Sequence, residues 1–124
     1  AEAIGASGRE LVEAYVVGFE VTTKISQSLY MTVQHAWHAP GNMGVLGATA
    51  ACAKLLRLSV EQTRMALGMA VSMAGGVEAN FGTMTKPLHV GHASRKAVVA
   101  TKLAAGGFTA NGEAIESGVG DDDG

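Results

Sequence analysis

Cysteine is almost absent from this 124-residue sequence, which contains only Cys52. A single cysteine cannot form an internal disulfide or a cysteine-rich zinc site. We therefore expect a fold that is stabilised by its apolar core alone. Such a protein suits a reducing compartment, and the cytoplasm is the expected location.

An excess of charge of either sign is also missing from the body of the chain. Outside the aspartate run 121–123, nine lysines and arginines stand against eight glutamates. This balance leaves no basic surface for a nucleic acid, and we expect none as a partner. Long hydrophobic runs are absent too, because Ser72 and several glycines interrupt the run 65–77, so we expect no transmembrane helix and no membrane partner.

The alternation of apolar and polar residues that marks strands is absent, and helical periodicity takes its place. The capping-box pattern Ser7-Gly8-Arg9-Glu10 predicts the start of a long first helix. Its charged residues fall on one arc, which predicts a mostly buried helix. The residues expected to face protein are Val12, Tyr15, Val16, Phe19 and Ile25.

Three more helices follow from the same kind of signal. Residues 29–41 have no clean period and predict a helix end and a loop, after which Pro40 suits the first turn of a second helix. A second capping box at 59–62 predicts a third helix, which Gly75-Gly76 ends. Pro87 opens a fourth, which stops at Gly106-Gly107.

Two stripes of side chains run along these helices. Gly44, Ala48, Ala51 and Leu55 form a small-residue stripe on the second helix, which lets another backbone approach closely. Met65, Met69 and Met73 form a methionine stripe on the third helix, which is typical of a core.

The fold class predicted is therefore all-α, a packed bundle of helices in one domain over residues 1–117. A short turn of helix is expected near 111–117. Residues 118–124 form an acidic, glycine-flanked tail that we expect to be disordered.

Candidate active-site residues lie at two loop-to-helix junctions, residues 37–41 and 83–89. The free N–H groups at a helix start attract anions, and here His38 and Lys86 add groups that can carry positive charge. If the junctions converge, they form a carboxylate site, with His38 suited to proton exchange and Lys86 to clamping a carboxylate. The simpler reading is that Lys86 is a solvated cation and that His38 caps a backbone carbonyl. Thr83 and Thr85 could bind a ligand, although such threonines more often satisfy local backbone groups.

The histidines His35, His38, His89 and His92 form two H-x-x-H pairs, so a metal site is conceivable. It is disfavoured, because no aspartate in the folded body could orient the rings and because this spacing arises easily by chance. We expect no metal and no other cofactor.

Several segments, in their order along the chain, resemble the MmgE/PrpD family, which includes 2-methylcitrate dehydratase, cis-aconitate decarboxylase and iminodisuccinate epimerase. The most specific is Gly82-Thr83-Met84-Thr85-Lys86-Pro87-Leu88-His89-Val90-Gly91. His38-Ala39-Pro40-Gly41 is another, and further pieces extend the resemblance over nearly the whole chain outside the tail.

The resemblance implies a segment of the family's helical domain, with His38 and Lys86 as active-site residues and Thr83, Thr85 and His89 beside the substrate. It implies a metal-independent lyase or isomerase that acts on a small di- or tricarboxylate by proton transfer next to a carboxylate. On this resemblance, the reaction expected first is that of a 2-methylcitrate dehydratase.

The chain departs from the family in its length. Family enzymes are several times longer and have an upstream aspartate-rich motif with a further histidine and a separate α+β domain. We therefore expect this sequence to be a fragment that is inactive alone.

Two rival functions remain open. One is a non-catalytic helical assembly module, and the other is a histidine-rich metal-binding module. In every case the apolar helices of so short a chain predict a partner, either a second copy in a homodimer or larger oligomer or the missing remainder of the same protein.

Overall fold

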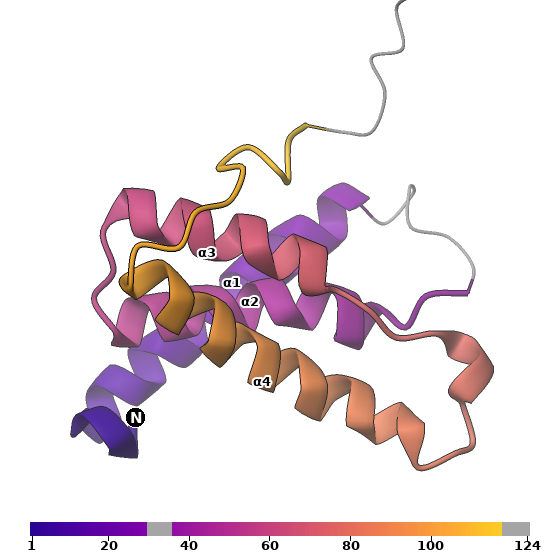
Figure 1. Ribbon diagram of the computed structural model, residues 1–124. Coiled ribbons are helices and arrows are strands. Elements are labelled where there is room, and N and C mark those ends of the chain that lie inside the picture. Colours follow the sequence, from indigo (N-terminus) through magenta and orange to yellow (C-terminus); the bar gives the residue numbers. More distant parts are fainter. Residues whose placement is uncertain (30–35, 118–124) are drawn as a thin grey trace, which may run out of the picture.

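The computed structural model describes residues 1–29 and 36–117, and this part of the chain is helical (Figure 1). In chain order its elements are η1 (Glu2–Ile4), α1 (Gly8–Leu29), α2 (Ala39–Leu55), α3 (Val60–Met73), η2 (Glu78–Asn80) and α4 (Thr85–Ala105). Within these ranges no strand forms, and the one isolated bridge joins Trp37 and Val77. The all-α prediction is confirmed. His35 and the tail 118–124 lie outside the described residues.

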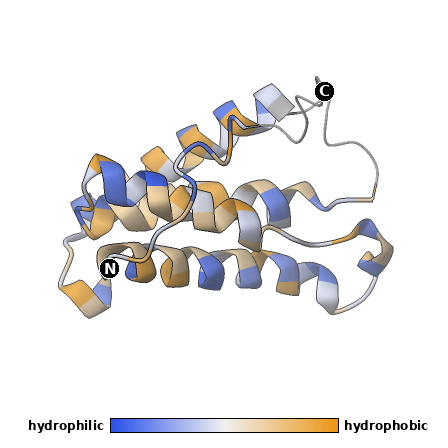
Figure 2. Ribbon diagram, turned by 45° about the horizontal axis from the view of Figure 1, so that its top comes forward, coloured by the Kyte–Doolittle hydropathy of each residue, from blue (hydrophilic) through white to orange (hydrophobic). Residues whose placement is uncertain are grey.

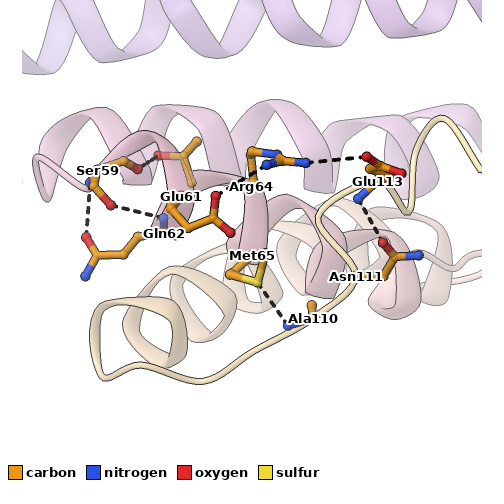
Figure 3. A network of polar contacts seen from close by, with 9 residues as sticks. Ser59, Glu61, Gln62, Arg64, Met65, Ala110, Asn111 and Glu113 are labelled. Atoms are coloured by element: carbon orange, nitrogen blue, oxygen red, sulfur yellow. Dashed lines mark hydrogen bonds and ion pairs between the residues drawn. The ribbon is translucent and has the colours of Figure 1, made fainter.

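Both predicted capping boxes are present. At the start of α1, the Ser7 hydroxyl accepts from the Glu10 N–H at 3.2 Å, and the Glu10 carboxylate accepts from the Ser7 N–H at 2.8 Å. Before α3, the Ser59 hydroxyl accepts from the Gln62 N–H at 3.1 Å, and the Gln62 amide oxygen accepts from the Ser59 N–H at 3.0 Å (Figure 3). Each box satisfies two backbone donors that a helix start leaves free.

Glu10 also links the start of α1 to the turn between α2 and α3, because its carboxylate accepts from Arg57 at 3.0 Å. The Ser7 N–H, then Arg57 and the Ser7 hydroxyl lower the pKa of the Glu10 carboxyl from 4.5 to about 2. A lowered carboxyl pKa stabilises the folded state above the unfolded value. The stabilisation that this link contributes is therefore complete above about pH 4.5 and is lost as the pH falls through about 2.

Helix α2 is the centre of the bundle. It contacts α1, α3 and α4, and α3 packs on α4 as well (Figure 1). One core cluster joins α2, α3 and α4 through Val45, Leu46, Ala70 and Ala93, and a second joins α3 and α4 through Ala66, Met69, Ala100 and Ala104. Since most of these side chains are alanines, the helix axes lie close together. Met65 and Met73 pack beside Met69, as expected for a core stripe.

Helices α1 and α2 meet through glycines. A Cβ at Gly18 would lie 2.8 Å from the Gly47 carbonyl oxygen and 3.1 Å from the Ala51 Cβ. A Cβ at Gly47 would lie 2.5 Å from the Gly18 oxygen and would overlap the Thr22 hydroxyl. Ala51, a member of the predicted small-residue stripe, therefore serves contact within the chain.

The prediction that the bulky face of α1 is buried is wrong for this chain. Exposed fractions are 61% for Val12, 70% for Tyr15, 53% for Val16 and 61% for Phe19. Helix α1 packs instead through its small residues Ala14 and Gly18, which are buried, because they allow the closest approach to α2. Ile25 packs against the first core cluster as expected. Figure 2 shows that hydrophobic residues recur along all the helices.

Helix α4 begins earlier than predicted. It starts at Thr85 rather than Pro87, so Lys86 lies in its first turn. Proline is tolerated there because the first N–H groups of a helix have no acceptor within the helix. Helix α3 ends at Met73, and of the two glycines that follow only Gly76 has a positive φ, of 131°.

The segment after α4 forms turns rather than a named helix: near 111–117 the Ala114 N–H donates to the Asn111 oxygen at 3.2 Å, and the Ser117 N–H donates to the Glu113 oxygen at 2.7 Å. The Ala110 N–H donates to the Met65 sulfur at 3.3 Å, and Arg64 lies 3.9 Å from the Glu113 carboxylate (Figure 3). Ile115 packs on the first core cluster. These contacts hold the turns against the helices.

None of the helices in the described ranges is long and apolar enough to cross a membrane.

The glycine contact between α1 and α2 predicts unequal effects of two alanine substitutions. Gly47→Ala forces a methyl group against Thr22 and the Gly18 oxygen, and we expect it to cost about 1–3 kcal/mol of unfolding free energy. Gly44→Ala lies one turn earlier, where a Cβ meets nothing within 4 Å, and the better helix propensity of alanine stabilises by up to about 1 kcal/mol. Urea unfolding followed by circular dichroism measures both. Equal effects of the two substitutions would show that α1 does not pack on α2 in this way.

Candidate functional site

The first predicted junction is held against the loop after α3. His38 is the N-cap residue of α2, and its N–H donates to the Gly76 oxygen at 3.0 Å. Beside it, the Glu78 N–H donates to the Ala36 oxygen at 2.9 Å. The Asn42 amide donates to the backbone oxygens of His38 at 3.0 Å and Gly76 at 3.3 Å. The backbone around His38 is therefore fixed by hydrogen bonds to a segment almost forty positions away.

The second junction reaches His38 through His89 of α4. The Nδ1 atoms of the two rings lie 3.0 Å apart, and the exposed fractions are 8% for His38 and 9% for His89. At this distance one ring donates an N–H to the other.

Phe81 connects His38 to Lys86. Its ring meets the His38 ring edge-on, with centroids 4.9 Å apart and an interplanar angle of 81°. The Lys86 ammonium lies 4.3 Å from the centroid of the Phe81 ring, a cation–π distance. Phe81 therefore links Lys86 to His38, and His38 in turn pairs with His89.

Thr83 and Thr85 shape the start of α4. The Thr83 hydroxyl donates to the Asn80 oxygen at 2.7 Å and accepts from the Thr85 N–H at 3.2 Å. The Thr83 hydroxyl thus makes the local backbone contacts typical of such a loop.

The surroundings of the site are rich in potential cations. Lys86 lies in the first turn of α4, where the helix dipole adds positive potential. On the side of His89, a surface pocket of about 250 Å³ is lined by Gly75, Gly76, Val77, Leu88, His89, His92 and Lys96. The lysine side chains and the start of α4 can attract an anion.

In the parts of the chain that the structure describes, no group of three or more histidine, cysteine, aspartate or glutamate side chains is placed to hold a metal ion. His35 of the first histidine pair lies outside these residues, and His89 and His92 line one pocket. Burial raises the pKa of the Cys52 thiol, which reduces the fraction of reactive thiolate.

Two residues of the site were missed by sequence reasoning. Phe81 lies in the loop before α4, and only its isolation as an aromatic residue beside a glycine and threonines could have drawn attention to it. Asn42 lies one turn after His38 and could have been noticed as a polar residue in an apolar helix.

Comparison with known proteins gives a consistent result. The family model described as MmgE/PrpD N-terminal domain matches residues 1–122. Cis-aconitate decarboxylase of Mus musculus is 39% identical over 116 residues, which are 92% of this chain and 24% of that protein. The Homo sapiens cis-aconitate decarboxylase is 38% identical over 89% of this chain and 23% of its own length. That of Aspergillus terreus is 32% identical over 92% of this chain and 24% of its own length. The chain thus spans about a quarter of the length of these relatives.

The contact between Gly76 and His89 predicts a site-specific effect of one substitution. Gly76→Ala would place a Cβ 3.0 Å from the His89 ring, at a φ of 131°. Gly82→Ala is the matched control, because Gly82 also has a positive φ, of 84°, but a Cβ there meets nothing within 4 Å. We expect each change to cost about 1–3 kcal/mol through backbone strain. Only Gly76→Ala should shift the imidazole NMR signals of His38 and His89. Unchanged signals in Gly76→Ala would contradict the described packing.

Proposed function

Because the chain belongs to the MmgE/PrpD family, we propose that it forms part of a lyase acting on a small di- or tricarboxylate. The observation that carries this proposal is the meeting of two helix starts, where Phe81 contacts both Lys86 and His38, and His38 pairs with His89. Family membership supports the lyase-like role. The cluster supports an anionic substrate, since it pairs a lysine with the dipole of α4.

Decarboxylation is the reaction we propose first. On the family resemblance alone, the reaction of a 2-methylcitrate dehydratase is expected first. The relatives reported above, however, are named as cis-aconitate decarboxylases. Both reactions need a bound carboxylate and a proton moved beside it. Turnover of cis-aconitate and turnover of 2-methylcitrate should therefore both be measured and compared.

Lys86 is proposed to bind a substrate carboxylate. Its ammonium stands in the first turn of α4, whose free N–H groups can bind the same anion. The Phe81 ring contacts both the Lys86 ammonium and the His38 ring. The lysine therefore places the substrate next to the histidine.

His38 is proposed to move the proton. In a decarboxylation the carbon that loses carbon dioxide keeps the bonding electron pair and then takes a proton, so a group that donates one must lie beside it. A histidine exchanges protons near neutral pH, and the hydrogen bonds from Asn42 and to Gly76 fix the backbone of His38. No metal or organic cofactor takes part in this proposal.

The remainder of the active site is proposed to come from protein outside this chain, because the chain corresponds to about a quarter of its relatives. On this proposal the 124 residues alone do not turn over substrate.

The proposed roles predict different kinetic defects in a full-length protein that contains this chain. Lys86→Ala removes a charge-assisted contact and should weaken transition-state stabilisation by about 1.5–3 kcal/mol, at least about tenfold in kcat/KM. His38→Gln should lower kcat by about 100-fold or more with a smaller change in KM, since a proton carrier acts in the chemical step. Release of carbon dioxide from cis-aconitate and loss of water from 2-methylcitrate are the two assays.

Lys102→Ala is the control, because Lys102 is an exposed lysine in the last turn of the same helix. It should retain the parent rate. If Lys86→Ala turns over the true substrate as fast as Lys102→Ala, the proposed site is wrong.

The exposed face of α1 favours a second role, in assembly. Leu11, Val12, Tyr15, Val16 and Phe19 are each about half or more exposed, and they lie on one helix. Exposed apolar patches of this kind mark protein interfaces. We propose that this face is covered in the working protein, and a second copy is the occupant that can be tested with the chain as it stands.

This assembly proposal predicts a dimer or larger species of the chain in analytical ultracentrifugation at micromolar concentration. A Tyr15→Lys/Phe19→Lys double variant should sediment as a monomer, because both charges would be buried in the interface. Lys24→Gln, an exposed change on the same helix, should leave the oligomer intact. A monomeric parent chain would contradict self-association through this face.

A further inference from the structure

The contact between the two buried histidines has a chemical consequence beyond substrate binding. We propose that His89 is a positioning residue for His38: its Nδ1 pairs with the His38 Nδ1, so that His38 exchanges protons through Nε2 alone. The use of this pair in catalysis rests on the proposed function, whereas the pair itself does not. The resemblance had instead placed His89 beside the substrate.

The number of hydrogens between the two rings limits the tautomers that they can adopt. A neutral imidazole has one N–H, and two Nδ1 atoms at 3.0 Å leave room for one hydrogen between them. If both rings are neutral, the donor has its N–H at Nδ1 and the acceptor has its N–H at Nε2. The two histidines are therefore opposite tautomers.

Protonation of His38 fixes the direction of the hydrogen bond between the two rings. When His38 takes up a proton at Nε2, it carries N–H groups at both nitrogens, so its Nδ1 must be the donor to His89. His89 then stabilises the positive charge of His38 as a hydrogen-bond acceptor, with its own N–H at Nε2. A pocket of about 250 Å³ adjoins His89 and offers room for water to accept that N–H.

The backbone around His89 restricts the position of its ring. A Cβ at Gly76 would lie 3.0 Å from the His89 ring, and a Cβ at Gly41 would lie 3.2 Å from the His89 Cβ. The absence of side chains at these two glycines lets the His89 ring reach His38. On the other side, the Phe81 ring packs edge-on against His38. A ring confined in this way can present only one nitrogen to a substrate.

In the proposed reaction, protonated His38 donates a proton to the substrate carbon. The Nε2–H bond of protonated His38 breaks, its electron pair stays on Nε2, and the proton forms a C–H bond with the carbon that has lost carbon dioxide. Both histidines end neutral, with the His38 Nδ1–H still donated to the His89 Nδ1. Water or the next substrate returns a proton to Nε2.

The charged groups around the pair come from two elements. Lys86 of α4 contacts Phe81, which also contacts His38, and His92 and Lys96 of α4 line the pocket beside His89. Glu78 of η2 is exposed. None of these replaces the contact between the Nδ1 atoms, so the pairing can be tested at His89 itself.

The first test needs no catalysis. Nitrogen-15 NMR of the imidazoles in this chain should show one of the two rings with an N–H at Nδ1 and the other with a bare Nδ1. His89→Asn keeps a polar atom at the place of Nδ1, and His89→Leu has the same shape without one. The Asn variant should keep His38 in one tautomer, and the Leu variant should leave His38 in a mixture. Bare Nδ1 atoms in both rings of the parent chain would overturn the proposal.

The second test uses turnover by a full-length protein that contains the chain. His89→Leu should lower kcat by about 100-fold with KM changed less than about twofold, and His89→Asn should recover most of the rate. Equal rates in the two variants, or a rise in KM without loss of kcat, would overturn a positioning role and return His89 to substrate binding. Arg95→Gln, an exposed change on the same helix, should keep the parent rate.

The NMR measurement separates this proposal from the proposed function, and a further variant covers a failure to fold. If no polycarboxylate is turned over by the parent protein, the proposed function fails, and the NMR result still decides the pair. If His89→Leu does not fold, His89→Gln takes its place, because its amide stands at the position of Nε2 rather than Nδ1. The Gln variant should then leave His38 in mixed tautomers, and a fixed tautomer would overturn the proposal.

Discussion

The close approach of backbones, made possible by missing side chains, is the constraint on which the rest of this structure depends. Glycines occur where two segments cross: Gly18 and Gly47 join α1 to α2, Gly41 faces the Gly75 oxygen, and Gly68 faces the Asn111 oxygen. The core between the helices is mostly alanine. Because so little volume separates the helices, a histidine in α4 reaches a histidine at the start of α2, and a site forms from two distant junctions.

Much of this fold was predictable because its signals are local. Ser7 and Ser59 announce helix starts through hydrogen bonds that span three residues, and these are formed. The Thr-Lys-Pro-Leu-His segment and the His-Ala-Pro-Gly segment carried the family resemblance, which the match over residues 1–122 confirms. Local chemistry also placed His38 and Lys86 at helix starts, although α4 begins two residues earlier than Pro87 suggested.

The features that escaped prediction depend on contacts between segments. Periodicity showed that Tyr15 and Phe19 share a face of α1, but not that the small face of Ala14 and Gly18 would pack on α2 instead. The pairing of His38 with His89 depends on ring orientation across 51 positions, and no spacing rule reports that. Phe81 acquires its place between His38 and Lys86 only when the loop closes.

The hydrogen bond of the His38 N–H to Gly76 has a consequence for the order of folding. Helices form from contacts within a few residues, whereas this bond and the Trp37–Val77 bridge close a loop that contains the whole of α2 and α3. The entropy of closing so long a loop is lost before its few contacts form, so these contacts form after the helices have docked. We therefore expect the junction at His38 to become ordered after the helices have docked and to open before the alanine core does. Amide hydrogens there exchange with solvent through local opening, long before those of the alanine core.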